Sequence, residues 1–536
     1  MRIIGMDSIE TKVVDSLRYS RKHPDFNTIN NEVDKQLKLL YKLGYIEAYL
    51  KEINQSSDST FLAQINLKNK FSKVRLYNIH LVNLQLLRPL IINKSDDYFE
   101  VAISNLETVL QLVNQDITAS GQPFAVVQLQ NLIPLDNNII TAYLDIEQNA
   151  KRTLDSIIIK GYEKFPKSFL KHQLKLNKNS VFNLERIKKQ TANLQNINFA
   201  NQIKEPEVLF TKDSTILYVY IEKSKVNNFD GFLGFGTNED TNKIEFDGYL
   251  NLNLINNLNY GETLKLLYKS DENEQRTFDV VVRMPYLFKS PIGITGNLNI
   301  FRRDSTFLST TQTLKLDYQI DVKNRFSAGI SSLRSDNLLS NTSLFFEDFK
   351  SNFYIAEYQH TAPQFYDFLF PVNFYVDISA GIGKRTVSNS DLNQSFLRLN
   401  TFKIFNLNER NSIYVRLDGA TLISDNYFEN ELFRFGGINS IRGFEENSLL
   451  ANLYSVLNTE YRYRLSNALY VHTVLDAAYS ENNISNSKDK LFGFGFGFGL
   501  LTNAGLFKFN YSSAKTENQQ FRLSDSKIHI SLTSQF

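Results

Sequence analysis

The chain has 536 residues, of which 42% are hydrophobic, and its 59 Lys and Arg residues nearly balance its 57 Asp and Glu residues. This balance excludes a strong global attraction to nucleic acid. The absence of cysteine excludes disulfides, thiolate catalysis and cysteine-ligated metal sites. No window of ~18 uninterrupted apolar residues occurs, which excludes a transmembrane helix but not a transmembrane β-barrel, whose strands alternate.

The first residues do not have the pattern of a secretory signal. Residues 1–5 carry one charge, and no apolar core of about 7–15 residues follows them. We therefore expect the sequence to begin at a mature or truncated N-terminus, which leaves open whether a signal peptide or further domains precede it.

Residues 1–224 are predicted to form three mixed α/β units, at 1–71, 72–150 and 151–224, each with the order β-α-α-β-β. Amphipathic or capped helices are predicted at 28–43, 100–114, 166–176 and 183–194. Strands are predicted at 46–53, 61–67, 124–129, 139–146, 154–160, 208–210 and 215–221. The alternative is a generic α+β region without a repeat.

Residues 225–536 are predicted to contain strands alone. In the stretches 244–254, 277–284 and 412–418, apolar residues alternate with polar or charged ones. Strands of ~9–11 residues with this period, separated by polar turns, are typical of a transmembrane barrel. A soluble sandwich also alternates, but sixteen consecutive strands are too many for one open sheet of at most ~10 strands.

The sixteen strands are predicted at 228–237, 242–254, 260–270, 275–285, 291–303, 307–320, 323–334, 350–361, 371–386, 393–406, 411–423, 450–465, 467–480, 490–500, 503–513 and 527–536. The predicted fold class is therefore an α+β N-terminal region of β-α-α-β-β repeats, followed by an all-β, 16-stranded antiparallel transmembrane barrel.

The loop between the eleventh and twelfth strands, residues 424–447, contains the sharpest local pattern. Its centre reads Phe-Arg-Phe-Gly-Gly-Ile-Asn-Ser-Ile-Arg-Gly-Phe over residues 433–444. A loop of this length is usually functional or disordered, and the glycine and aromatic content is unlike a disordered segment. A structural surface turn is the alternative. The candidate site residues are Gly436, Gly437, Ile441, Arg442, Gly443 and Phe444.

This segment resembles the loop-six motif of the outer-membrane protein assembly factor superfamily (BamA/TamA-like), in which a glycine-rich run precedes Val/Ile-Arg-Gly-Phe/Tyr. That family joins tandem periplasmic POTRA domains, each β-α-α-β-β, to a 16-stranded barrel, with the motif between strands eleven and twelve. The resemblance covers nearly the whole chain. It implies that the loop folds into the lumen and that Arg442 pairs with Glu460 and Asp476, which otherwise are ordinary lumen charges.

Residues 492–499 alternate strictly between phenylalanine and glycine. We expect the phenylalanines to face lipid and the glycines to face the lumen. Because glycine permits close approach of another backbone, this wall is predicted to make room for the folded loop. Barrel curvature alone is the alternative explanation.

The seam between the first and last strands is a second candidate site. Glycines weaken the first strand, and an open edge is a template for strand addition. The resemblance implies that an incoming barrel strand pairs there. The candidate residues are Phe229, Gly231, Gly234, Gly236, Ile528, Ile530, Leu532 and Phe536.

No catalytic constellation is predicted. The six histidines are scattered, and neither a phosphate loop nor a nucleophile elbow occurs, so we expect no catalytic residue, metal or cofactor. The resemblance implies a bacterial outer-membrane insertase that assembles client barrels. Its partners would be unfolded outer-membrane proteins, periplasmic or outer-membrane accessory proteins and the lipid bilayer. A two-partner-type secretion transporter and a passive porin remain alternatives.

Overall fold

The computed structural model describes residues 1–136, 138–237, 244–270, 275–304, 306–339, 346–364, 367, 369–388, 390–502, 505–517 and 526–535. The chain divides into two compact units. The first comprises Met1–Ser156, Lys178–Ile187 and Val208–Leu217, and the second comprises Ile157–Asn177, Lys188–Glu207 and Tyr218–Phe536. Among the described residues, no helix is both long and apolar enough to cross a membrane.

The first α/β segment has the predicted order β-α-α-β-β. Its elements are β1 (Arg2–Ile4), α1 (Ser8–Ser16), α2 (Phe26–Lys42), β2 (Tyr49–Ser57) and β3 (Thr60–Asn66), with the sheet order β1-β3-β2. Helix α2 begins two residues before the predicted start, because the Asp25 side chain accepts a hydrogen bond from the Thr28 backbone N–H at 2.7 Å and caps the helix. Val33, Leu37 and Leu40 are buried, as their spacing predicts.

The second segment has a hairpin that the prediction missed. Its elements are β4 (Lys73–Tyr77), α3 (Leu84–Leu87), β5 (Ile91–Lys94), β6 (Tyr98–Ala102), η1 (Ile103–Asn105), α4 (Leu106–Ala119), β7 (Val126–Pro134) and β8 (Ile139–Glu147), with the sheet order β5-β6-β4-β8-β7. The predicted start of the second helix at residue 100 is wrong. Glu100 lies in β6, where it accepts hydrogen bonds from Arg75 Nε at 2.9 Å and Nη2 at 2.7 Å across the sheet.

The third segment has a shorter first helix than predicted. Its elements are β9 (Ser156–Gly161), η2 (Phe169–Gln173), α5 (Leu184–Ala192), η3 (Asn193–Asn196), β10 (Ala200–Gln202), β11 (Glu207–Phe210) and β12 (Thr215–Lys223), and β12 pairs with β9, β10 and β11. In place of the helix predicted at 166–176, one wide π-helical turn places the ring of Phe169 between Phe199 and Tyr286, at centroid distances of 5.1 and 4.9 Å.

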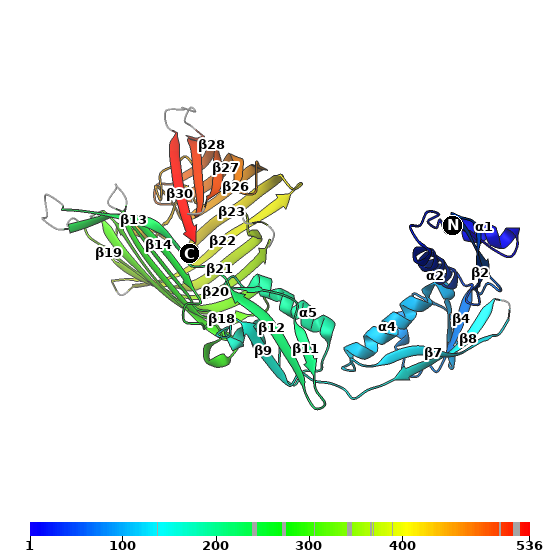
Figure 1. Ribbon diagram of the computed structural model, residues 1–536. Helices are drawn as coiled ribbons and strands as arrows, with labels where there is room; N and C mark the ends of the chain where they lie inside the picture. The colour runs from blue at the N-terminus through cyan, green and yellow to red at the C-terminus, as the bar shows by residue number, and fades with distance from the viewer. Residues whose placement is uncertain are drawn as a thin grey trace. The chain divides into compact units, whose positions relative to one another are not determined.

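Sixteen antiparallel strands form the closed barrel, drawn from green to red in Figure 1. This confirms the predicted fold class and count, and the predicted bounds differ by only a few residues. The strands are β13 (Asn228–Thr237), β14 (Ile244–Ile255), β15 (Thr263–Ser270), β16 (Gln275–Met284), β17 (Ile292–Arg303), β18 (Phe307–Gln319), β19 (Asn324–Asn337), β20 (Phe349–Pro363), β21 (Val372–Val387), β22 (Ser390–Asn406), β23 (Asn411–Ile423), β26 (Leu453–Arg464), β27 (Leu469–Asn482), β28 (Ser487–Thr502), β29 (Gly505–Thr516) and β30 (Lys527–Gln535).

The two faces of the barrel wall differ as the alternation predicts. On β18, Leu314 and Leu316 are 50% and 56% exposed on the outer face, whereas Asp317 between Leu316 and Tyr318 is 3% exposed. The lumen contains several ion pairs, among them Arg283 with Asp317 and Arg325 with Glu357. On β18 the outer face is therefore apolar at these positions, and the inner face holds the charge.

Candidate functional site

The loop between β23 and β26 is folded against the inner wall of the barrel. It contains a 3-10 turn, η5 (Glu429–Glu431), and a short hairpin of β24 (Phe433–Phe435) with β25 (Leu449–Ala451). Ile441 is fully buried in a cluster with Phe435 and Leu491, and Phe444 packs against the edge of that cluster. The loop thus has its own apolar core, which holds the segment around Arg442 in one conformation.

Gly436 and Gly437 form the turn that leads into this segment. Both have left-handed backbone conformations, with φ values of +109° and +96°, which residues with a Cβ rarely adopt. The Gly437 N–H donates to the Ile441 carbonyl at 3.1 Å and closes the turn. The turn directs Arg442 toward the wall formed by β26 and β27.

The structure places Arg442 against both carboxylates that the resemblance implied. Its Nε and Nη2 donate to the two Asp476 oxygens at 2.9 and 2.6 Å, and its Nη1 donates to Glu460. Its backbone N–H also donates to Asp476, at 2.9 Å. The side chains of Arg442 and Asp476 are 6% and 0% exposed. The pair is therefore bidentate and desolvated, which is the strongest geometry for an arginine and a carboxylate.

Glu460 is shared by a second arginine. Arg462 Nε donates to Glu460 Oε2 at 2.7 Å, and the Nδ1 atom of His472 lies 3.8 Å from the same oxygen. The sequence reasoning did not identify Arg462 or His472. Their alternating positions on β26 and β27 place them on the lumen face with Glu460 and Asp476. The register of the two strands could therefore have identified both residues.

Two glycines allow the backbone of the loop to approach the wall. A Cβ on Gly493 would collide with the Arg442 carbonyl oxygen. Gly493 belongs to the alternating phenylalanine and glycine run of β28, in which Phe494 and Phe496 are 41% and 59% exposed on the outer face. Gly443 has φ +94°, and a Cβ there would lie 2.7 Å from the Ser513 backbone carbon. At both positions the backbone of the loop is in direct contact with the backbone of the barrel wall.

Replacing Gly443 with alanine should destabilise the folded loop. The new Cβ meets backbone, which cannot rotate away, and the left-handed conformation adds a strain of ~1–2 kcal/mol. We expect a lower urea midpoint in a heat-modifiability gel assay. Gly296→Ala is the matched control, because a Cβ at Gly296 meets nothing within 4 Å. Equal midpoints for both variants would contradict the close contact.

A second anchor of the loop was missed by the sequence reasoning. Arg385 on β21 donates to Glu431 of η5, and both side chains are 2% exposed. Gln394 on β22 donates to the other Glu431 oxygen at 3.0 Å, and the Phe428 backbone N–H donates to Glu431 at 2.9 Å. The loop is thus held by a second buried ion pair, to β21, as well as at Arg442.

Removing the charge at this second anchor should lower the barrel's stability. Glu431→Gln leaves Arg385 buried without its counter-charge, and breaking a buried pair costs about 3–5 kcal/mol. Glu429→Gln, two residues away, is the control, because its pair with Arg303 (3.3 Å) is partly exposed and such pairs contribute about 1 kcal/mol or less. The two urea midpoints should separate clearly, and coincident midpoints would show that Glu431 does not anchor the loop.

The end of the motif contacts strands near both sides of the barrel seam. Glu445 pairs with Lys527 at the start of β30 at 2.8 Å, and Glu446 pairs with Lys269 on β15 at 3.7 Å. The hydrogen bond from Lys527 lowers the pKa of the Glu445 carboxyl below its usual range. These exposed pairs are individually weak, but together they connect the loop to the last strand, β30, and to the third strand, β15.

The seam between β13 and β30 is the weakest junction of the barrel. Only two residue pairs join these strands in the described part of the chain, Asn228 with Gln535 and Phe229 with Ser534, whereas ten pairs join β13 to β14. Gly231, Gly234 and Gly236 lie on β13 beyond the paired end.

The other predicted seam residues lie on or beyond β30. Ile528 and Ile530 are 60% and 63% exposed, and Leu532 is in the same strand. Phe536 is outside the described residues.

The POTRA family, described as a surface antigen variable number repeat, matches residues 153–224. No curated protein matches the sequence.

Solved structures match over most of the chain. BamA from Haemophilus ducreyi lacking POTRA domains 1–3 matches with a TM-score of 0.51 and 14% identity over 86% of this chain and 98% of that chain. CdiB from Acinetobacter baumannii matches with a TM-score of 0.53 and 14% identity over 95% of this chain and 97% of that chain. CdiB from Escherichia coli matches with a TM-score of 0.54 and 13% identity over 94% of this chain and 98% of that chain.

These matches confirm the recognised architecture. Residues 153–224 match the POTRA family, and the chain has the fold of the BamA and CdiB structures, as predicted. Because the identities are low, the likeness establishes the fold alone. The activity has to be inferred from the chemistry of the sites.

Proposed function

We propose that this chain is an outer-membrane insertase that assembles client β-barrel proteins. In this proposal the barrel lies in the bacterial outer membrane, the POTRA units receive unfolded clients in the periplasm, and the β13–β30 seam templates the incoming strand. Accessory proteins and the lipid bilayer are the other proposed partners. The process is one of binding and exchange of hydrogen bonds, so we propose no covalent catalytic step.

The observation that carries the proposal is the contrast between two pairs at the β13–β30 seam and ten at the β13–β14 junction. Unpaired backbone N–H and C=O groups on a strand edge attract another strand. At the seam these groups belong to strands that face the membrane. A client strand can therefore pair with one edge without first breaking a long ladder.

The anchored loop favours an insertase over a passive porin. A porin needs an open lumen, whereas here Arg442 and Glu431 hold a folded loop inside the barrel by two buried ion pairs. A two-partner-type secretion transporter is the second candidate function. The structural likeness to CdiB supports it as much as the likeness to BamA supports the insertase.

A reconstitution assay separates these functions. The full chain is placed in liposomes, a urea-denatured barrel client is added, and client folding is followed as a heat-modifiable band on a gel. The proposal predicts faster folding than in empty liposomes. An unchanged folding rate, together with ion conductance in a planar bilayer or passage of a polypeptide, would favour the transporter or the porin.

A further inference from the structure

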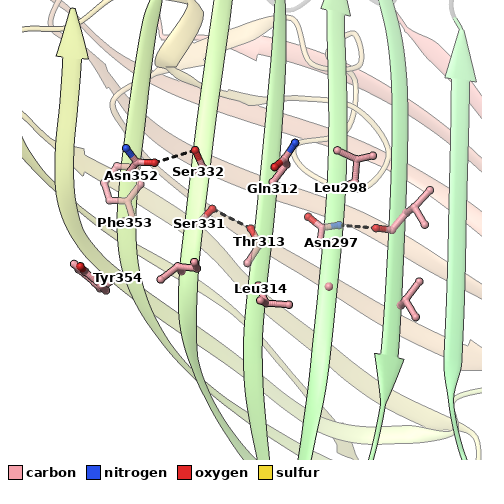
Figure 2. Close-up of a pocket in the computed structure, with 14 residues that line it drawn as sticks. Asn297, Leu298, Gln312, Thr313, Leu314, Ser331, Ser332, Asn352, Phe353 and Tyr354 are labelled. Atoms are coloured by element: carbon pink, nitrogen blue, oxygen red, sulfur yellow. Dashed lines mark hydrogen bonds between the residues drawn. The ribbon is translucent and has the colours of Figure 1, made fainter. Parts of the chain in front are cut away.

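The outer face of β18, β19 and β20 changes from apolar to polar well before the strands end. Leu314, Ile330 and Tyr354 lie in one row across these strands, at exposures of 50%, 54% and 74%. The next row along the strands lies closer to the end of the barrel where the loop between β23 and β26 leaves the wall, and this row is polar. It consists of Gln312, Ser332 and Asn352, which Figure 2 shows side by side.

On one side, the same two rows are free of polar side chains. Opposite Gln312 and Leu314 stand Leu298 and Gly296 on β17, followed by Val280 and Val282 on β16. On the other side, the polar row continues with Lys384 on β21. The polar row therefore borders the apolar band of β16 and β17, and polar side chains at membrane depth are costly unless polar groups of another molecule cover them.

A hollow of about 620 Å³ spans this step in polarity, because Gln312, Ser332 and Asn352 line it together with apolar residues. Gly296 lies within it, and a Cβ there would meet nothing within 4 Å. Val282 is among the apolar residues that line the hollow, as are Leu298 and Leu314, which are labelled in Figure 2. A volume of this size accommodates a segment of acyl chain, and the apolar part of the lining matches one.

Cationic side chains border the polar row. Lys384 stands directly opposite Asn352, and Arg334 and Lys350 form the next outward row. Arg334 pairs with Asp336 at 2.9 Å and Lys384 with Asp391 at 3.5 Å, both at exposed positions where such pairs are weak. Lys350 makes no ion pair with any residue that the structure describes.

We infer that this surface binds a phosphorylated glycolipid of the surrounding leaflet. Arg334, Lys350 and Lys384 contact its phosphate groups, and the amides and hydroxyl of the polar row contact its sugar. One acyl chain occupies the hollow over Gly296. This inference rests on the proposed placement of the barrel in an outer membrane, but it does not depend on insertase activity.

The order of the rows selects this class of ligand. From the hollow toward the barrel end, the surface is apolar, then hydrogen-bonding and uncharged, then cationic. A phosphoglycolipid presents acyl chain, sugar and phosphate in a matching sequence. A phospholipid with a small headgroup offers few groups for Gln312, Ser332 and Asn352, so we expect it to bind more weakly.

Binding of a fluorescent lipid A probe to the full-length chain tests the inference. Anisotropy is measured in mixed micelles of a zwitterionic detergent, with labelled phosphatidylglycerol as the second arm. The triple variant R334Q/K350Q/K384Q should weaken lipid A binding at least about five-fold. Gly296→Leu, which fills the hollow, should weaken it by a similar factor.

The matched control is K12Q/K51Q/K323Q, which removes three exposed lysines elsewhere on the chain and should leave binding unchanged. A heat-modifiable band confirms that each variant is folded. Unchanged binding by the triple variant, or equal loss in the control, would overturn the inference, as would phosphatidylglycerol binding as tight as lipid A binding. A doubled mass in native mass spectrometry, lost in the triple variant, would instead assign this surface to a second copy of the chain.

Discussion

Replacing Arg442 with alanine should lower the free energy of unfolding of the barrel by about 3–5 kcal/mol. The substitution leaves Asp476 and Glu460 buried without the guanidinium that now donates to both. It also removes the contact that holds the tip of the loop against β26 and β27. The measurement is the urea midpoint of the heat-modifiable band for the full chain in detergent.

The control is Arg334→Ala, whose ion pair with Asp336 is exposed and worth about 1 kcal/mol or less. A double variant, R442A/D476N, separates the two causes of the loss, and Glu460 is left unchanged because Arg462 also pairs with it. If the cost comes from an unpaired buried charge, neutralising Asp476 should recover part of the stability. A loss for Arg442→Ala no larger than for Arg334→Ala would contradict the anchoring role.

Locking the seam should abolish client assembly. Phe229 and Ser534 face each other across β13 and β30, and directly opposed residues of an antiparallel pair lie roughly 4.5–5.5 Å apart at Cα, within the range that a disulfide spans. The double variant F229C/S534C should form this disulfide under mild oxidation. We expect client folding in liposomes to fall at least about ten-fold when it is oxidised, which corresponds to ~1.4 kcal/mol in the barrier, and to recover on reduction.

The chain offers a close control for this experiment. Phe229 also faces Leu252 on β14, across a junction of ten pairs. Oxidised F229C/L252C therefore carries a disulfide from the same residue to a strand that the proposal does not require to separate. Because the natural chain has no cysteine, no other disulfide competes. Equal inhibition by both disulfides, or by neither, would remove the seam from the mechanism.

The barrel could be predicted from the sequence because alternation on a strand reports directly which face is buried. Strands such as β23, with the same bounds in prediction and structure, needed no long-range information. The helix predicted to start at residue 100 failed for the opposite reason. The burial of Glu100 depends on Arg75, which lies 25 positions away and becomes a neighbour only through the sheet register.

The two anchors of the loop show the same limit. Arg442 could be predicted because a family motif surrounds it and implies its carboxylate partners. The pair of Arg385 and Glu431 lies in no motif, and its members are 46 positions apart. The two residues meet only because the loop after β23 folds back over β22 and β21, so neither periodicity nor spacing could identify the pair.

Disulfide trapping can show whether a client strand pairs with the free edge of the seam. Leu233→Cys places a thiol on β13 beyond the two residues that pair with β30. Leu266→Cys places one on β15, which is paired on both sides. Each variant is mixed in liposomes with a denatured barrel client that carries one cysteine in its last strand. The proposal predicts a covalent adduct with Leu233→Cys and none with Leu266→Cys. Equal adducts at both positions, or none at Leu233→Cys while the client folds, would contradict it.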